Sequence, residues 1–354
     1  MIEPDDLDGD GDEEGAPDGA PLTDGHRPSH LRVMAFDAQG RPAVLEHRFP
    51  VEGECHGWRL DRFLQKKMPR LSRARIQRVI HGDLDVDGRP VRKPAATVLT
   101  GQVVAFRRPA PPEPEVVRDV SVLLEDPAFF AFDKPAGLPM HPTARYHWGT
   151  LTALLRERFP TETLYIAHRL DRETSGVLLA ARSREAAVSL KRAFARRLVE
   201  KRYHAIVHGA LDEERLIDAP LGLGGRRVRV QMAVRPVEEG GLPSRTWVRP
   251  LGRHGAYTLV EARPETGRQH QIRVHLAHIG LPIVGDKLYP DDEPFIEWSD
   301  NGPSEELVAR LGLPRHALHA ARIGFPHPTT GARVTVESPL PSDLAAFLAV
   351  TRPE

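Results

Sequence analysis

Apolar positions in residues 58–107 change their spacing partway along the segment. Two stretches, RLDRFLQKK and LSRARIQRVIHG, carry apolar side chains at the three- and four-residue spacing of amphipathic helices. The following stretch, LDVDGRPV, alternates apolar and polar residues around Asp87-Gly88, a pair typical of two-residue hairpin turns. Ser72 is suited to cap the second helix. The pattern predicts a compact helix pair followed by a β-hairpin.

Residues 119–354 show a different pattern, in which short apolar runs recur without regular alternation of strand and helix. We expect helices only at SREAAVSLKRAFARRL and HQIRVHLAHI. The predicted strands are VSVLLED, FFAFDK, LYIAH, GVLLAARS, YHAIVHG, RTWVRPL, AYTLVEARP and ARVTVES. Such an order favours an α+β domain with a mixed, largely antiparallel sheet and flanking helices.

Three further segments complete the predicted organisation. Residues 1–30 have almost no large apolar side chains and are expected to form a disordered acidic tail. Residues 31–57 predict short lead-in strands around a turn at Gly40. Residues 108–118 are proline-rich and predict an extended linker between the two domains.

The charge of the 354-residue chain is zero overall but unevenly distributed. Residues 1–30 carry ten acidic side chains and one basic one, which leaves 48 basic and 39 acidic side chains in the remainder. Residues 51–108 alone contain thirteen bases and six acids. A basic surface of this kind favours a polyanionic partner. The expected nucleic-acid-binding residues are Arg73, Arg75 and Arg78, which lie off the apolar helical stripe, with Lys66 and Lys67.

Residues 58–107 as a whole resemble the small RNA-binding module first named from ribosomal protein S four. The resemblance covers both helices and the hairpin in order. It implies that this domain binds structured RNA.

Several functional classes lack the residues they need. The single cysteine, Cys55, excludes a disulfide framework and fits a reducing compartment. No apolar run reaches the length of a membrane span, and the N-terminus is acidic where a signal peptide is basic, so we expect a soluble cytoplasmic protein without membrane contact. The histidines in HQIRVHLAH do not have the spacing of a zinc helix, and the sequence contains no dinucleotide or phosphate loop. We therefore expect no metal and no cofactor.

A polar loop between two apolar strands is the first candidate for chemistry. In LYIAHRLDRETSGVLLAARS, His168, Arg169, Asp171 and Arg172 are held together at the edge of the predicted sheet. A carboxylate flanked by arginines has a lowered pKa and stays ionised, which suits a nucleophile or base. The residues alone leave a second role open, in which Asp171 caps a turn and pairs with arginine.

Two other side chains are candidates from their position in predicted elements. Tyr203 lies on one face of the strand KRYHAIVHG, where its ring could stack on a base or simply fill the core. Arg273 flanks the buried stripe of the helix in HQIRVHLAHI, from where it can reach a carboxylate or phosphate.

Five separated motifs resemble one family, the RluA-type pseudouridine synthases. They occur in family order as FDKPAGLPMHP, HRLDRETSG, KRYHAIVHG, TGRQHQIRVHLAHIGLPIVGDKLY and RHALHAARIGFPHP. The resemblance implies that Asp171 is the catalytic residue, that Tyr203 contacts the uracil and that Arg273 pairs with Asp171. It further implies that Leu276 belongs to the substrate pocket. We expect His168 and Arg169 to support the loop and to contact the flanking RNA backbone.

The resemblance implies an enzyme that isomerises uridine in structured RNA, with large-subunit ribosomal RNA as the expected target. Asp171 could attack the anomeric carbon or remove a sugar proton, and the sequence leaves both routes open. The alternative is a non-catalytic RNA-binding protein or chaperone that uses the same pocket. We expect a monomer. The segment from Tyr289 to His316 is a polar insertion, expected to form a surface loop and a short helix without a catalytic role.

Overall fold

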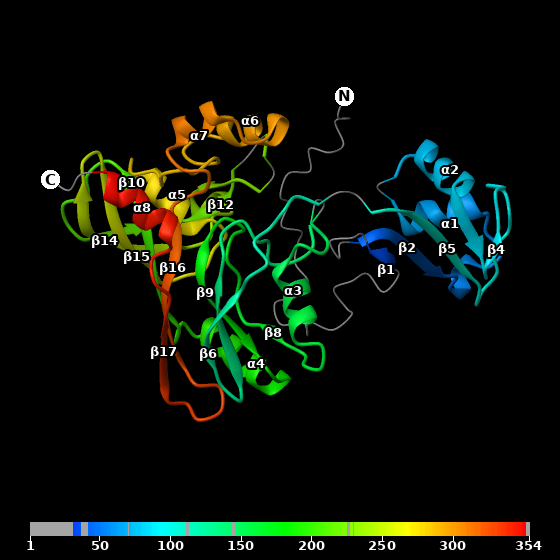
Figure 1. The fold of residues 1–354 in the computed structure, drawn as a ribbon, viewed down its shortest axis with the longest axis horizontal. Helices are drawn as coiled ribbons and strands as arrows, with labels where there is room; N and C mark the ends of the chain where they lie inside the picture. The colour runs from blue at the N-terminus through cyan, green and yellow to red at the C-terminus, as the bar shows by residue number, and fades with distance from the viewer. Residues whose placement is uncertain are drawn as a thin grey trace. The chain divides into compact units, whose positions relative to one another are not determined.

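The computed structural model describes residues 31–36, 42–69, 71–110, 113–143, 146–224, 227, 228 and 230–351. These residues form two compact units, with the boundary between residues 113 and 114 (Figure 1). Each unit is described by itself. The predicted tail, residues 1–30, lies outside the described residues.

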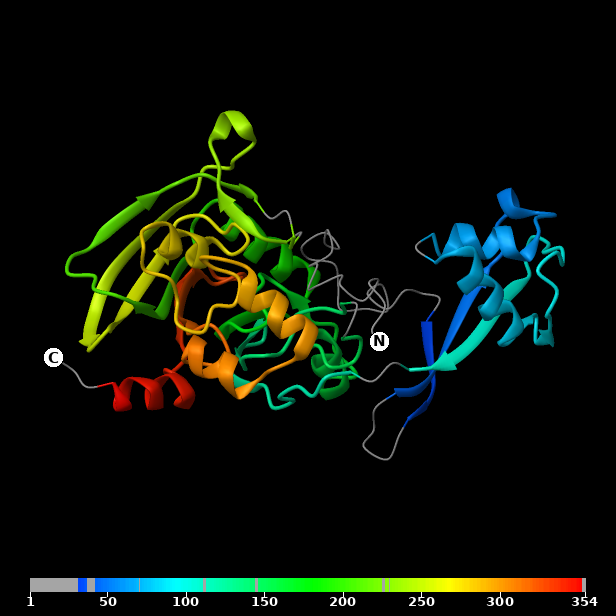
Figure 2. The same cartoon turned by 90° about the horizontal axis from the view of Figure 1, so that it is seen from above.

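The small unit is a five-stranded antiparallel sheet with two helices packed on one face (Figure 2). The strand order is β1-β2-β5-β3-β4. The strands are β1 (Leu31–Phe36), β2 (Pro42–Pro50), β3 (Asp83–Val86), β4 (Arg89–Pro90) and β5 (Val103–Pro109). The helices are the 3-10 turn η3 (Gly53–Cys55), α1 (Leu60–Lys67) and α2 (Arg73–His81).

Local signals in the sequence account for these elements. The Ser72 hydroxyl accepts a hydrogen bond from the backbone N–H of Arg75 and caps α2. Asp87 and Gly88 both have positive φ, as a type I′ hairpin turn between β3 and β4 requires. The structure differs from the expected organisation at residues 31–57. β2 pairs with β5 from Val44 to Pro50, so the lead-in strands share the sheet of the helix pair.

The large unit is built on a mixed ten-stranded sheet with a two-stranded ribbon beside it. The main path runs β11-β14-β15-β10-β16-β9-β7-β6, with β17 on β16 and β8 on β9. The strands are β6 (Ser121–Glu125), β7 (Phe129–Lys134), β8 (Tyr165–Ile166), β9 (Ser175–Ala181), β10 (Glu200–His208), β11 (Arg215–Asp218), β14 (Arg245–His254), β15 (Tyr257–Pro264), β16 (Leu318–Pro326) and β17 (Arg333–Glu337). The ribbon consists of β12 (Leu221–Leu223) and β13 (Met232–Val234).

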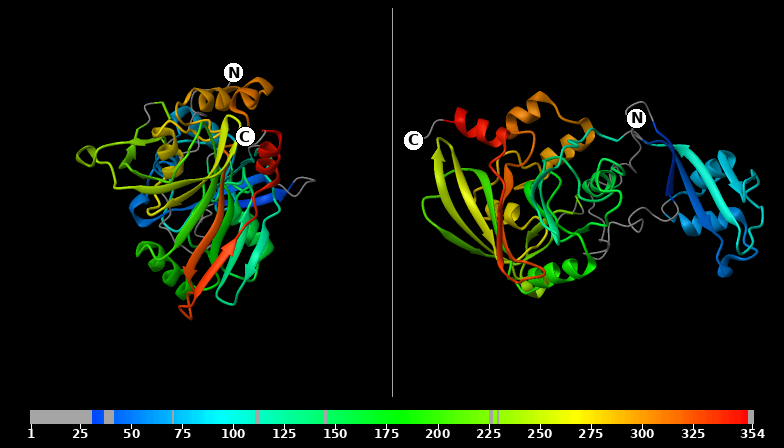
Figure 3. Two further views of the ribbon diagram at one scale, coloured as in Figure 1. Left: turned by 90° about the vertical axis from the view of Figure 1, so that its left-hand side faces the viewer. Right: turned by 60° about the horizontal axis from the view of Figure 1, so that its bottom comes forward.

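Helices cover both faces of this sheet. They are α3 (Leu151–Arg158), α4 (Arg184–Ala195), the 3-10 turn η4 (Val237–Glu239), α5 (Gln271–His278), α6 (Glu293–Asn301), α7 (Glu305–Leu311) and α8 (Ser342–Val350). Side chains alternate across β7, so that Phe130 and Phe132 pack with α3 while Phe129 and Ala131 pack with α4. α3 and α4 therefore lie on opposite faces of the β7–β9 region. α6 and α7 lie next to each other (Figure 3).

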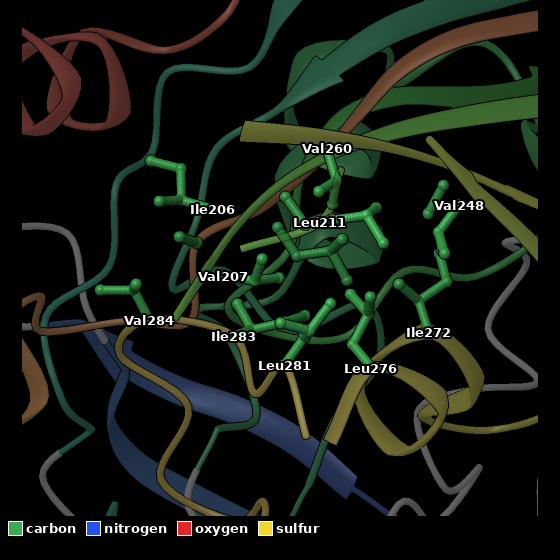
Figure 4. Close-up of a cluster of buried hydrophobic side chains, with 14 of the residues drawn as sticks. Ile206, Val207, Leu211, Val248, Val260, Ile272, Leu276, Leu281, Ile283 and Val284 are labelled. Atoms are coloured by element: carbon green, nitrogen blue, oxygen red, sulfur yellow. The ribbon is translucent and has the colours of Figure 1, made fainter. Parts of the chain in front are cut away.

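α5 packs on the other half of the sheet through a separate apolar cluster. Ile272 and Leu276 of α5 meet Val207 of β10, Val248 of β14 and Val260 of β15 (Figure 4). Burial of this stripe fixes the rotation of α5 about its axis. The flanking side chain of Arg273 is therefore directed along the sheet toward the middle of the unit.

Two glycines are needed where segments distant in sequence approach closely. Gly176 has a φ of 111°, and a Cβ there would lie 2.3 Å from the carbonyl oxygen of Ala320. Only glycine permits this parallel contact between β9 and β16. Gly285 has a φ of 77°, and a Cβ there would lie 2.0 Å from the carbonyl oxygen of Arg315. These contacts bring the N-terminal end of β9, the segment after Gly285 and the start of β16 together.

The expected α+β class with a mixed, largely antiparallel sheet is confirmed, whereas the expected list of helices was too short. α3 and α8 are present, and the insertion forms two helices, α6 and α7. α3 was missed because residues 151–158 show no clean polar face: Leu151, Thr152, Leu154 and Leu155 are all buried. No helix in the described parts of the chain combines the length and the apolar character needed to cross a bilayer.

Candidate active site

The loop between β8 and β9 carries Asp171. It runs beside β9, where the backbone N–H of Ala167 donates to the carbonyl of Leu179, and it turns at Asp171, whose carbonyl accepts from the N–H of Thr174. The Asp171 side chain retains 22% exposure, so its carboxylate can be reached from solvent. A rigid strand on each side holds it in place.

Arg273 of α5 meets this carboxylate across 102 residues of sequence. Its Nη1 donates to Oδ2 of Asp171 at 3.1 Å. The Arg273 side chain is only 8% exposed. Because the pair is largely removed from water, the attraction is less screened than in a surface ion pair. The pairing expected from the family resemblance is therefore present in the structure.

Electrostatics keeps Asp171 ionised. Burial would raise the pKa of its carboxyl group, but His270 and Arg273 outweigh burial and hold that pKa below its usual value. Burial also lowers the pKa of His270 to about 4, so this imidazole is uncharged at neutral pH. Arg273 is then the main cation beside Asp171 at neutral pH, and the carboxylate is available as a nucleophile or base.

Asp286 holds Arg273 from the other side. Nε of Arg273 donates to Oδ2 of Asp286 at 2.7 Å, and Nη2 donates to Oδ1 at 2.9 Å. Oδ1 of Asp286 also accepts from the backbone N–H groups of Leu288 and Tyr289. The fully buried Asp286 side chain thus takes two guanidinium donors in a fixed geometry. Nη1 of Arg273 remains to donate to Asp171.

Tyr289 contacts both Arg273 and His270. Its ring lies 5.0 Å from the guanidinium carbon of Arg273, and its hydroxyl is 2.8 Å from Nδ1 of His270. The same hydroxyl accepts from the backbone N–H of Met232 in β13. His270 precedes α5 with a φ of 52°, a conformation unusual for a residue other than glycine. The β12–β13 ribbon is therefore linked to the start of α5 through one buried phenol.

Glu173 anchors the loop two residues after Asp171. Both of its carboxylate oxygens accept from Nζ of Lys287 at 2.9 Å, and the backbone N–H of His316 donates to Oε2 at 3.1 Å. The hydroxyl of Thr174 lies 2.8 Å from Nε2 of the same His316. Lys287 follows Asp286 directly. One short segment therefore binds both Arg273 and the loop that carries Asp171.

Lys134 holds the loop that carries Asp171 through hydrogen bonds to backbone carbonyls. Its Nζ donates to the carbonyls of Pro135, Leu138 and Arg172, at 2.9, 2.9 and 3.0 Å. The side chain is fully buried, and burial lowers the pKa of Lys134 to about 7. The carbonyl of Arg172 also accepts from the N–H of Gly137. The residue after Asp171 is thus fixed by two donors.

Tyr203 lies close to Asp171 along the sheet. It pairs with Ala320 of β16, which in turn pairs with Gly176 of β9, and its ring packs between two apolar clusters. Burial, together with the charge of Asp171, raises the pKa of the Tyr203 phenol. The structure therefore brings Asp171, Arg273 and Tyr203 to one place.

The other candidates of the large unit lie around this group. Nε2 of His168 accepts from the N–H of Leu179, and its ring lies 5.0 Å from the ring of Phe194 in α4. Burial lowers the pKa of His168 to about 3, which leaves it neutral. Arg169 is exposed, and Leu276 is fully buried in the apolar cluster beneath α5. In this structure His168 and Leu276 act as packing and hydrogen-bonding groups of the frame.

The basic candidates of the small unit line its two helices. Arg73 and Arg78 of α2 are exposed, and Arg75 is half-buried. Lys66 and Lys67 of α1 form ion pairs with Glu54 and Glu52, at 2.5 and 3.0 Å. Charge on α2 is thus more available to a partner than charge on α1.

Sequence reasoning missed the residues that hold the site together. Asp286, Lys287, Tyr289, Glu173 and Lys134 all lie in or beside the five motifs, yet no role could be assigned to them. Their partners are up to 143 residues away, and local periodicity carries no information on such contacts. The one available signal was the position of charged residues inside apolar motifs. Tyr289, at the start of the polar insertion, contacts Arg273, and this contact was not predicted.

The arrangement presents an ionised carboxylate, a guanidinium that orients it and a flat aromatic ring. The carboxylate can attack or deprotonate a sugar while a planar base stacks on the aromatic ring. Within the described ranges, no three His, Cys, Asp or Glu side chains gather so that they could hold a metal ion.

A family model described as RNA pseudouridylate synthase matches residues 128–278. The match includes Asp171, Tyr203 and Arg273. An uncharacterized RNA pseudouridine synthase of Chloroflexus aurantiacus is 41% identical over 300 residues, which cover 82% of this chain and 89% of that protein. The ribosomal large subunit pseudouridine synthase D of Pseudomonas aeruginosa is 35% identical over 318 residues, with 87% and 97% covered.

Solved structures agree with the sequence relatives. The human RNA pseudouridylate synthase domain containing 1 superposes with a TM-score of 0.53 at 28% identity and covers 68% of this chain and 91% of its own. The human RNA pseudouridylate synthase domain containing 4 gives a TM-score of 0.52 at 26% identity, with 66% and 94% covered.

Proposed function

Because the chain belongs to the RNA pseudouridylate synthase family, we propose that it converts uridine to pseudouridine in large-subunit ribosomal RNA. The observation that carries the proposal is the Asp171–Arg273 pair, in which a partly exposed carboxylate is kept ionised by a buried guanidinium. The choice of RNA is supported by relatives named ribosomal large subunit pseudouridine synthases, which are 35% and 37% identical to this chain.

Asp171 is the catalytic residue in this proposal. The target uridine leaves its stack and enters the site, since the sugar carbon that reacts is out of reach inside a helix. The carboxylate of Asp171 then either attacks the anomeric carbon or removes a sugar proton. On either route the glycosidic bond to N1 breaks, the base turns over, and C5 bonds to the sugar. The proton lost from C5 is balanced by one gained at N1.

The surrounding residues bind and orient. The Tyr203 ring packs on the everted base, and Arg273 fixes the direction of the Asp171 carboxylate. Arg169, exposed on the same loop, contacts the backbone beside the target nucleotide. His168 keeps the loop on β9 through its hydrogen bond to Leu179, and Leu276 supports α5 from the core.

The small unit serves to bind RNA. Its resemblance to the ribosomal protein module and the exposed arginines of α2 support this role. Phosphate contacts of this kind position an enzyme on structured RNA without specifying sequence. We propose that the protein acts as a monomer in the cytoplasm, on ribosomal RNA, and that it needs no metal or cofactor because an isomerisation neither oxidises nor releases anything.

The test is to map pseudouridines in ribosomal RNA from cells with and without this protein, by chemical labelling followed by sequencing. Loss of one or more pseudouridines in large-subunit RNA, restored by the wild-type chain, is the expected result. An unchanged large-subunit map would refute the proposed target. Loss of sites in another RNA alone would retain the activity and replace the substrate.

A further inference from the structure

The outer face of α4 carries an unusual set of basic side chains. Arg184, Lys191, Arg192 and Arg196 belong to the helix or its C-cap, and Arg197 follows directly. Only Glu185 offsets them over residues 184–197. The inner face is apolar and buried, with Ala186, Ala187, Leu190 and Ala193 against the sheet. We call Lys191, Arg192, Arg196 and Arg197 the α4 basic surface.

Ion pairing distinguishes this surface from much of the large unit. Exposed arginines elsewhere in the unit commonly pair with a carboxylate, as Arg333 pairs with Glu200 and Arg310 pairs with Glu297. Among the described residues, no carboxylate forms an ion pair with any member of the α4 basic surface. Four like charges without counter-charges repel one another, and this cost is offset when an anionic partner binds.

The backbone at Arg197 provides a second, independent observation. α4 ends in a Schellman motif: the N–H of Leu198 donates to the carbonyl of Ala193, and the N–H of Arg197 donates to that of Phe194. The motif places Arg197 at the left-handed position, with a φ of 57°. Glycine is the usual residue there because a Cβ is strained in that conformation. An exposed arginine at this position gains nothing for the fold that glycine would not supply.

We propose that the α4 basic surface binds the sugar-phosphate backbone of the RNA substrate, at a distance from the everted nucleotide. This inference rests on the proposed function for the identity of the RNA. Guanidinium groups pair with phosphate oxygens in bidentate geometry, and three of the four members are arginines. The strained residue is retained for its charge.

The dimensions fit a run of phosphates. The α4 basic surface extends from residue 191 to residue 197, about 9 Å along the helix axis, which corresponds to two or three phosphates of one strand at about 3.4 Å each. α4 is also tied to the catalytic loop, because the rings of Phe194 and His168 lie 5.0 Å apart. His168 is three residues from Asp171, a span of at most about 10 Å. RNA bound on α4 can therefore extend to the loop that carries Asp171.

The first test measures equilibrium binding of the full-length chain to transcribed large-subunit ribosomal RNA. The salt concentration is varied from about 0.05 to about 0.3 M, because phosphate contacts make the affinity depend on salt in this range. The variant carries Lys191→Gln, Arg192→Gln, Arg196→Gln and Arg197→Gly together. Loss of four phosphate contacts reduces the slope of log affinity against log salt by about 3. A purely electrostatic loss of that size weakens binding at 0.1 M salt by up to about a thousandfold.

Arg197→Gly alone gives the sharper signature. Relief of the left-handed strain is expected to raise the melting temperature by about 2–4 °C. The same substitution should lower RNA affinity and reduce the salt slope by about 1. A residue with only a structural role cannot give both effects. Higher stability with unchanged RNA affinity would overturn the proposal for this residue.

Arg215→Gln is the control for loss of an exposed arginine outside the α4 basic surface. Arg215 is an exposed arginine of β11, at the far edge of the sheet, and has no carboxylate partner among the described residues. Its substitution should leave the salt slope unchanged. An unaltered slope in the fourfold α4 variant would overturn the proposal and assign the surface to another acidic partner.

Turnover separates this inference from the proposed function. At saturating RNA, the fourfold variant should keep the wild-type kcat, with the loss confined to KM. If the wild-type chain forms no pseudouridine in this RNA, the proposed function fails while the binding series still decides the role of α4. If the wild type is active and kcat of the variant falls with affinity unchanged, α4 acts through the catalytic loop and the proposal is wrong.

Discussion

Replacement of Asp286 by asparagine tests whether Arg273 must be correctly oriented toward Asp171, because both residues of the pair remain in the protein. Asparagine keeps the volume and one carbonyl oxygen, which can still accept from the N–H groups of Leu288 and Tyr289. The amide nitrogen, however, faces Nε of Arg273, where Oδ2 of Asp286 accepts at 2.7 Å. Two donors then oppose each other, and Arg273 loses its bidentate anchor.

The cost can be worked out from these contacts. Breaking a buried ion pair costs about 3–5 kcal/mol when the remaining charge has no partner. Here Arg273 keeps Asp171, so the loss is nearer to that of one charge-assisted hydrogen bond, about 2–3 kcal/mol in the free energy of unfolding. A guanidinium displaced by about 1 Å misdirects the Asp171 carboxylate, and kcat is expected to fall by about 100-fold.

The dependence of kcat on pH distinguishes loss of positioning from a general loss of stability. Arg273 lowers the pKa of Asp171 through its charge and its hydrogen bond, so a displaced guanidinium lets that pKa rise. The acid limb of the kcat profile should therefore move to higher pH while the plateau falls. RNA affinity should be unchanged. Urea unfolding and single-turnover assays at saturating RNA across pH measure both effects.

Glu261→Gln is the control. Glu261 is another buried carboxylate, which accepts from Nε of Arg249 at 2.8 Å and pairs in register with His204, whose side chain lies on the opposite face from Tyr203. This variant should lose stability without loss of kcat. If Asp286→Asn kept the wild-type kcat, or lost activity only in proportion to the unfolded fraction, Asp286 would not position Arg273.

Three further outcomes follow from the structure. Tyr203→Phe should retain most activity because the ring remains, whereas Tyr203→Ala should lower kcat/KM; equal losses in steady-state assays would refute a stacking role. Neutralising Arg73, Arg75 and Arg78 together should reduce the salt slope of RNA binding by about 3, and an unchanged slope would exclude α2 as a phosphate contact. Burial lowers the pKa of Lys134 to about 7 while an unfolded lysine titrates near 10.4. The unfolded chain then binds more protons between these values, so the free energy of unfolding should rise by about 1.4 kcal/mol per pH unit from pH 7 to 9. The same rise in Lys134→Met would contradict this assignment.

Local patterns predicted the elements whose cause is local. The α2 cap at Ser72, the Asp87-Gly88 turn and the two-turn helix α5 each depend on residues a few positions apart, and the structure confirms them. The family motifs pointed to Asp171 and Arg273, which lie 3.1 Å apart. No periodicity could indicate that contact, because it joins a loop and a helix 102 residues apart.

The frame around the pair could not be predicted, for a related reason. Lys134 is a charged residue at the end of β7, and Glu173 and Lys287 lie in loops, where periodicity predicts nothing. Each of the three is held by partners on other segments. α3 was missed because it is apolar on more than one face. The glycine contacts at Gly176 and Gly285, which bring these segments together, are equally invisible without the fold.

The central claim is that the Asp171 carboxylate carries out the chemistry. The most direct measurement is single-turnover pseudouridine formation by Asp171→Asn on large-subunit ribosomal RNA, with binding and unfolding followed in parallel. Asparagine preserves shape and the hydrogen bond from Arg273, so fold and RNA affinity should stay close to wild type while pseudouridine formation is abolished. Product formed at a rate near that of the wild type would contradict the account.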